Sequence, residues 1–206
     1  MAGTFPIAVL ISGRGTNLAA IHAASEAGTL DARIVAVCSN RPEAYGVRWA
    51  REQGLPVAVF ARADYGSRAA AQEAMLAHLQ TVGAQLVVLA GWEQVLIPAF
   101  VAAFDGRLLN VHPSLLPAFA GTMHAVEEAL AYGAKVTGCT VHYVTDDVDC
   151  GPIVLQAAVP VLDDDTPETL LARIHEREHE LLPRAIALHT AGRLRVEGRH
   201  VRILGD

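Results

Sequence analysis

Short, nearly continuous apolar runs alternate with helical patterns along the first half of the chain, and this alternation limits the possible folds strongly. The runs cover residues 7–11, 32–39, 56–60, 85–90 and 107–112, with helical patterns near 17–27, 43–53 and 67–82. Strands that are apolar on both faces and alternate with helices are typical of a parallel sheet. We therefore predict an α/β fold, with a mostly parallel sheet and helices on both of its faces.

The second half of the chain has a different pattern. A helix is predicted near 123–132, and two longer strands at 135–144 and 152–161 follow it, which we expect to be antiparallel. A long helix is predicted from about 167 to 191, because Thr166 is a typical N-cap and Pro167 suits the first helical position. The tail alternates apolar and polar residues around Gly198, which predicts a small hairpin.

Composition excludes several classes of protein. The 206 residues, 52% of them hydrophobic, suit a single domain with a sizeable core. The formal net charge of -6 and the lack of a basic run argue against a nucleic-acid partner. No apolar stretch approaches the ~20 residues of a membrane span, so we expect no membrane partner. Because three scattered cysteines suggest reduced thiols and the first residues lack a basic leader, we expect a cytoplasmic protein.

A glycine loop joins the first strand to the first helix. In "LISGRGTNLAAI", Gly13 and Gly15 precede the helix, whose N-terminal amides can bind an anion. A dinucleotide site would have a third glycine where the chain has Leu18, so a phosphate monoester fits better than NAD. The alternative is a tight turn that binds nothing.

Two polar side chains interrupt the apolar strand at 107–112. Asn110 and His112 are two residues apart, so they point to the same side of the strand, near the edge where such sheets bind ligands. An amide can donate to an oxyanion, and an imidazole can move a proton near neutral pH. The alternative is a structural pair whose hydrogen bonds are satisfied within the protein.

Acidic residues supply two further candidates. Asp146, Asp147 and Asp149 lie in a loop between two predicted strands, where solvated acids are common. None of them has the ligand spacing of a metal site, so we predict no metal. Glu178 lies in the middle of the apolar stripe of the long helix, and a carboxylate there needs a ligand or a partner such as Arg173.

Several stretches together resemble the folate-dependent formyltransferase family, and in particular the glycinamide ribonucleotide formyltransferases of purine synthesis. They are "LISGRGTNL", "VVLAGW", "GRLLNVHPSLLPAFAG" and "GCTVHYVTDDVDCGPIVLQ". The resemblance implies one Rossmann-like formyltransferase domain over residues 1–206, with a phosphate-binding half of about 1–105 and a catalytic and folate-binding half of about 106–206. We expect a monomer or homodimer, and the sequence does not decide between the two.

The resemblance implies roles for individual residues. Asn110 and His112 match the catalytic pair, and Asp149 matches the acid that supports the histidine. Residues that match the ribonucleotide site are Gly15, Thr16, Asn17 and Glu178. Residues that match the site of the cosubstrate, 10-formyltetrahydrofolate, are Arg68, Glu93, Gln94, Val95 and Leu96, together with Asn110.

The chain departs from the family pattern near the folate site. Trp92, Glu93 and Gln94 stand where the family usually has Phe-Met-Arg, and Ala120 stands where it usually has proline. An acid at this site would repel the anionic tail of the folate. We therefore expect Glu93 to point to water, backbone groups to hold the pterin, and Arg68 to attract the tail.

The family resemblance implies direct attack of the glycinamide amine on the formyl carbon, without a covalent enzyme intermediate. Methionyl-tRNA formyltransferase shares the Ser-Leu-Leu-Pro core but is expected to have a further C-terminal domain. Formyltetrahydrofolate hydrolase is expected to have a further N-terminal domain. This hydrolase and a non-catalytic phosphate-sugar binding module are the alternatives to the transferase.

Overall fold

The computed structural model describes residues 4–205, which form two compact units. The first unit extends to Leu109 and the second begins at Asn110, within strand β5 (Leu108–His112). The elements of the first unit are β1 (Phe5–Ile11), α1 (Thr16–Glu26), β2 (Ala32–Ser39), α2 (Tyr45–Glu52), β3 (Val57–Val59), α3 (Arg62–Tyr65), α4 (Arg68–Thr81), β4 (Leu86–Leu89) and α5 (Pro98–Ala103). Those of the second are α6 (Ala125–Tyr132), β6 (Val136–Tyr143), β7 (Ile153–Pro160), α7 (Pro167–Thr190), β8 (Leu194–Glu197) and β9 (His200–Ile203).

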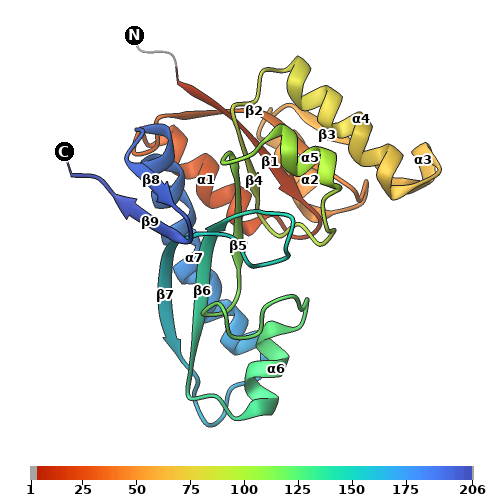
Figure 1. Ribbon diagram of the computed structural model, residues 1–206. Coiled ribbons are helices and arrows are strands. Elements are labelled where there is room, and N and C mark those ends of the chain that lie inside the picture. Colours follow the sequence, from red (N-terminus) through yellow and green to blue (C-terminus); the bar gives the residue numbers. More distant parts are fainter. Residues whose placement is uncertain (1–3, 206) are drawn as a thin grey trace. The chain divides into compact units, whose positions relative to one another are not determined.

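The strands of the first unit are parallel, as predicted. β1 lies between β2 and β4, and β3 pairs with the outer side of β2 (Figure 1). The side chains of β1 from Ile7 to Ile11 are completely buried, which explains the uninterrupted apolar run in the sequence. The carboxyl ends of β1, β2 and β4 lead into the segments that begin at Ser12, Asn40 and Ala90.

The second unit contains the predicted antiparallel pair. β6 and β7 run antiparallel, and α7 packs against both (Figure 1). Thr166 caps α7 as predicted, in a reciprocal capping box with Thr169. β8 and β9 form the predicted hairpin, and β9 pairs with β7 at Ile153. The mixed sheet, mostly parallel at first and antiparallel later, agrees with the predicted fold class.

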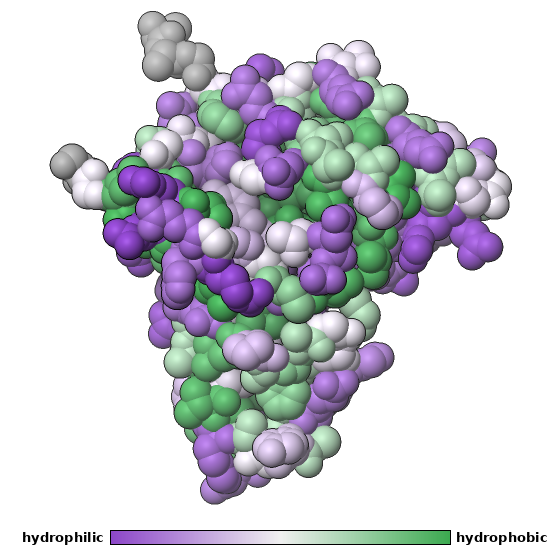
Figure 2. Space-filling view, in the orientation of Figure 1, coloured by the Kyte–Doolittle hydropathy of each residue, from purple (hydrophilic) through white to green (hydrophobic). Residues whose placement is uncertain are grey.

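Two short helices lie where the sequence predicts none. α3 has four residues and α5 has six, so neither is long enough to show a helical period. Within residues 4–205, no helix combines the length and the apolar character that crossing a membrane requires. On the face shown in Figure 2, hydrophilic and hydrophobic residues are interspersed over both units, as is usual for a protein surface.

Candidate active site

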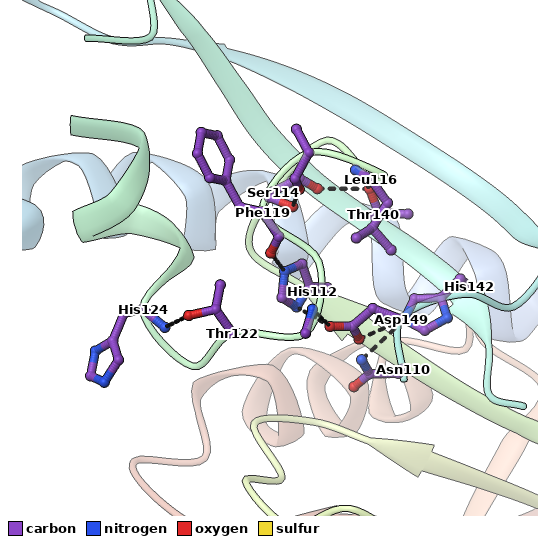
Figure 3. A network of polar contacts seen from close by, with 12 residues as sticks. Asn110, His112, Ser114, Leu116, Phe119, Thr122, His124, Thr140, His142 and Asp149 are labelled. Carbon is purple, nitrogen blue, oxygen red and sulfur yellow. Dashed lines mark hydrogen bonds and ion pairs between the residues drawn. The ribbon is translucent and has the colours of Figure 1, made fainter. Parts of the chain in front are cut away.

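Asn110 and His112 lie on strand β5 in the second unit, and a polar network surrounds them (Figure 3). Their spacing of two residues places both side chains on the same side of the strand, as predicted. His112 is buried and Asn110 is half-buried. The structure therefore brings the two predicted catalytic side chains to one place within this unit.

Both ring nitrogens of His112 face oxygen atoms. Nε2 lies 2.9 Å from the carbonyl oxygen of Phe119, and Nδ1 lies 3.4 Å from Oδ2 of Asp149. A neutral imidazole can donate at only one nitrogen, whereas an imidazolium can donate at both. Each ring nitrogen of His112 therefore has an acceptor oxygen beside it.

Asp149 lies between two histidines. Its Oδ2 accepts a hydrogen bond from the backbone N–H of Gly121 at 2.8 Å and faces His112, while its Oδ1 lies 3.6 Å from Nε2 of His142. Burial alone would raise the pKa of Asp149, but the Gly121 hydrogen bond and the charge of a protonated His112 lower it. Asp149 is therefore a carboxylate near neutral pH.

Two residues around His112 have unusual backbone angles. Asp149 has a φ of 53° and Phe119 a φ of 55°, values that a residue with a side chain rarely adopts. Such a conformation costs on the order of 1–3 kcal/mol, so the surrounding structure has to hold it. Both residues contact His112, so the strained backbone positions are gathered around one side chain.

His142 orients the amide of Asn110. Nδ1 of His142 lies 2.8 Å from the carbonyl oxygen of Tyr143, which can only accept, so this nitrogen carries a proton. In a neutral ring Nε2 is then an acceptor, and it lies 3.1 Å from Nδ2 of Asn110. Asn110 therefore donates one amide hydrogen to His142 and retains a second. The sequence signal for His142 is its period-two spacing from Thr140, which an ordinary core histidine would share.

The apolar loop after β5 is held by buried polar groups. Thr140 Oγ1 donates to the carbonyl of Ser114 at 2.7 Å and accepts from the backbone N–H of Leu116 at 3.1 Å. Gln156 Nε2 donates to Leu116 O at 3.0 Å, and Ser114 Oγ donates to Ala118 O at 2.6 Å. The hydroxyl of Ser114 is therefore engaged in holding the loop, and not in a nucleophile-base pair.

Glu178 is buried on α7, with 3% of its surface exposed, as its place in the apolar stripe predicts. Its Oε2 lies 3.9 Å from Nε2 of His175 on the same helix. The alternative that Arg173 pairs with Glu178 is wrong, because both terminal nitrogens of Arg173 bond the carboxylate of Asp165, at 2.8 and 2.9 Å. Arg173 lies on another side of the helix, next to the N-terminal turn.

The glycine loop lies in the first unit and packs against backbone. Gly15 is the N-cap of α1 with a φ of 76°, and no side chain within the described residues caps this helix. A Cβ on Gly15 would lie 2.8 Å from Cα of Gly46, whose own N–H donates to the carbonyl of Gly13. Thr16 and Asn17 form the first turn of α1, where backbone N–H groups lack helical partners. The start of α1 is therefore packed closely against the backbone of Gly46, a contact that no local sequence pattern indicates.

With the exception of Asn110, the predicted folate-site residues belong to the first unit, so they lie outside the half of about 106–206 that was expected to bind folate. Arg68 is exposed at the first position of α4, and residues 93–96 follow β4. Glu93 is not directed simply to water. Its carboxylate pairs with Nε of Arg41 at 2.6 Å and accepts from Nδ2 of Asn40 at 3.3 Å. Arg41 therefore compensates the charge that the sequence left without a partner.

We expect that replacing the side chain of Glu93 has a small effect. In Glu93→Met we expect the KM for the folate to change by no more than about fivefold, because a partly exposed pair typically contributes ~0.2–1 kcal/mol. The exposed fractions of the Arg41 and Glu93 side chains are 57% and 28%. Steady-state kinetics at low and high salt measure the change, which should shrink as salt rises. A change near 100-fold that persists at high salt would contradict a charge role of this size.

Within residues 4–205, no group of three or more His, Cys, Asp or Glu side chains is arranged to hold a metal ion. The three cysteines are free, with Cys38 and Cys139 buried and Cys150 exposed.

Comparison with known proteins gives consistent matches. Residues 6–186 match the Formyl transferase family. The phosphoribosylglycinamide formyltransferase of Haemophilus influenzae is 42% identical over 93% of this chain and 90% of that protein. The trifunctional purine biosynthetic protein adenosine-3 of Gallus gallus is 43% identical over 92% of this chain, which corresponds to 19% of that longer protein.

Solved structures agree with these sequence matches. Glycinamide ribonucleotide transformylase 1 from Symbiobacterium toebii superimposes with a TM-score of 0.96 and 48% identity, covering 100% of this chain and 96% of that one. A formyltetrahydrofolate deformylase from Pseudomonas syringae has a TM-score of 0.92 at 25% identity, covering 99% of this chain and 67% of that one. The deformylase therefore shares the architecture at a lower sequence similarity.

Proposed function

The chain belongs to the formyl transferase family, and we propose that it formylates glycinamide ribonucleotide with a catalytic cluster of Asn110, His112 and Asp149. The assignment of this reaction, a step of purine synthesis, rests on relatives and solved structures named for that activity. They are 40–48% identical to this chain over most of its length. The catalytic roles rest on one observation: Asp149 lies between His112 and His142, and His142 in turn orients Asn110.

The formyl donor of this family is derived from folate, and we propose 10-formyltetrahydrofolate as the cosubstrate. The amine of the ribonucleotide attacks the formyl carbon, and a C–N bond forms while the carbonyl oxygen becomes an oxyanion. The bond from that carbon to the folate nitrogen then breaks. The attacking amine loses one proton and the folate nitrogen gains one, so the reaction is balanced without a metal or a redox partner.

Asn110 is suited to the oxyanion. Its amide has two hydrogens, and one of them is donated to His142 at 3.1 Å. The second hydrogen is available to the developing negative charge, which a fixed donor stabilises in the transition state. The Nδ1 proton of His142 points to Tyr143 and not to Asn110, so the amide of Asn110 cannot turn over without losing its partner.

His112 is suited to moving the proton. Asp149 lies beside Nδ1, and the backbone carbonyl of Phe119 lies at Nε2. For Nε2 to reach a substrate atom, Phe119 has to withdraw, and residues 117–124 are largely exposed. We propose that substrate atoms replace the Phe119 carbonyl at His112 during the reaction, and that Asp149 stabilises the imidazolium.

The remaining candidate residues are proposed to bind parts of the two substrates. We propose that the backbone amides of Gly15, Thr16 and Asn17 hold the phosphate of the ribonucleotide, since α1 begins there without a side-chain cap. Glu178 is proposed to contact the ribose. Arg68 is proposed to attract the anionic tail of the folate, and the backbone of residues 93–96 is proposed to hold its pterin.

A two-substrate assay tests the proposed function. The purified protein is given 10-formyltetrahydrofolate with and without glycinamide ribonucleotide, and the formylated product and tetrahydrofolate are measured. We expect both products in equal amounts, and only when the ribonucleotide is present. Release of formate without the ribonucleotide would indicate a hydrolase, and binding without turnover would indicate a binding module.

A further inference from the structure

A buried glutamine on α4 directs its whole amide at one segment of the chain. Gln72 is 1% exposed and belongs to the buried face of α4, together with the apolar residues Ala71, Met75 and Leu79. Its Oε1 accepts from the backbone N–H of Ile97 at 2.8 Å. Its Nε2 donates to the backbone carbonyl of Val95 at 3.1 Å and to Oε1 of Gln94 at 3.3 Å. The N–H of Ile97 fixes which end of the amide is the oxygen.

This segment is also held at its beginning. The backbone N–H of Glu93 donates to Oγ of Ser12 at 3.2 Å, and Ser12 donates to Asn40 at 2.7 Å. Ser12 follows β1 and Asn40 follows β2, so the ends of two parallel strands support the segment that leaves a third. At each of residues 93, 95 and 97, a backbone group is therefore hydrogen-bonded to a side chain from another segment of the first unit, either Ser12 or Gln72.

The residues between these positions have free backbone groups. Among residues 4–205, no hydrogen bond is formed to the backbone N–H or C=O of Gln94 or Leu96. In an irregular segment, polar backbone groups are the ones that can recognise a ligand, provided that the backbone is held in one conformation. The backbone of residues 93, 95 and 97 is fixed by hydrogen bonds, and the polar backbone groups of Gln94 and Leu96 between them are available to a ligand. This combination makes a preorganised backbone site.

We propose that Gln72 is a positioning residue for the folate site: it fixes the backbone of residues 94–97 so that the free groups of Gln94 and Leu96 are preorganised for the cosubstrate. This inference rests on the proposed function, which places the pterin at residues 93–96. Gln72 itself touches no substrate in this scheme. Its effect is transmitted through Val95 and Ile97, so it should appear in folate affinity and not in ribonucleotide affinity.

The first test replaces the amide by an apolar side chain of similar size. In Gln72→Leu we expect the KM for 10-formyltetrahydrofolate to rise about tenfold or more, because two backbone groups of the segment lose their partners. The KM for the ribonucleotide should stay within about twofold, a factor too small to reflect a lost hydrogen bond. Met75→Ala is the control, since Met75 is buried on the same face and has no contact of this kind.

The control separates positioning from general loss of stability. Met75→Ala should lower the melting temperature at least as much as Gln72→Leu, since it leaves a core cavity, without a selective change in folate KM. If the two variants weaken folate binding equally, or if Gln72→Leu affects both substrates alike, the inference is wrong.

A second variant gives a pH readout. In Gln72→Glu the ionised carboxylate can accept from Ile97 but cannot donate to Val95, whereas the protonated acid can do both. Glu93, the charged residue of the segment, is already paired with Arg41. We expect folate binding by Gln72→Glu to improve as pH falls relative to wild type, and that of Gln72→Leu to show no such recovery. Equal pH dependence of the two variants would contradict the proposal.

Direct titration keeps this inference distinct from the proposed function. Tetrahydrofolate is titrated into each variant by calorimetry, without the ribonucleotide. If the wild type formylates the ribonucleotide but tetrahydrofolate binds all variants equally, only the role of Gln72 is overturned. If the wild type does not formylate the ribonucleotide, the proposed function is overturned, while a selective loss of tetrahydrofolate binding in Gln72→Leu would still support the positioning role.

Discussion

Asn110→Ala, His112→Ala and Asp149→Asn are each expected to lower kcat by ~10² or more, because each removes charge stabilisation or proton transfer from the transition state. Asn110→Ala removes the amide hydrogen left free by His142. His112→Ala removes the imidazole, and Asp149→Asn removes the charge beside it while retaining a similar shape. Single-turnover kinetics with both substrates saturating measure the chemical step.

The three side chains act as a unit, so their effects should not multiply. The double variant Asn110→Ala with His112→Ala should lose much less than the product of the two single losses, because both residues serve the same transition state. His124→Ala is a control from the same unit, since its side chain is exposed and contacts none of the three residues, while its backbone N–H donates to Thr122. Near-normal turnover in all three single variants would remove the assignment.

The charge of Asp149 also gives a direction for pH dependence. Its pKa lies below the ordinary value of 3.8, despite the opposing effect of burial. The stabilisation from this carboxylate is therefore fully present above that ordinary value and is lost as pH falls through the lowered pKa. In Asp149→Asn this acid-side loss of stability should be absent, and the unfolding temperature measured against pH between neutral and strongly acidic conditions tests it.

The sequence predicts the main elements because their patterns are local. Apolar runs and helical periods identify the strands and long helices to within a few residues, and Thr166 and Pro167 mark the start of α7. The pair Asn110 and His112 is predictable for the same reason, since a period of two places both on one side of β5. These predictions need no knowledge of how distant segments meet.

The remainder of the site depends on contacts between segments far apart in the sequence. Asp149 contacts Gly121 and His112, and His142 is a partner of Asn110, with separations of 28 to 37 residues. No local pattern distinguishes His142 from an ordinary core histidine. Gln72 is likewise only one polar residue within a predicted helix, and only the fold brings it to Val95 and Ile97.

The glycine loop of the first unit gives the second large expected effect. In Gly15→Val we expect the KM for the ribonucleotide to rise by ~10² or more, because the loop backbone has to move away from its anion-binding position. Two physical causes act together. Gly15 has a φ of 76°, which a β-branched residue adopts only with strain, and its Cβ would lie 2.8 Å from Cα of Gly46.

The contact with Gly46 decides the size of this effect, because a backbone atom cannot rotate away as a side chain can. Gly28→Val separates the two causes. Gly28 has a similar φ of 70°, but a Cβ there would meet nothing within 4 Å. The Gly28→Val variant should therefore have a lower melting temperature because of backbone strain, and its KM for the ribonucleotide should not change. For Gly15→Val the folate KM should stay near that of the wild type. Equal losses for both substrates would mean that the loop only supports the fold, and the phosphate would have to bind elsewhere.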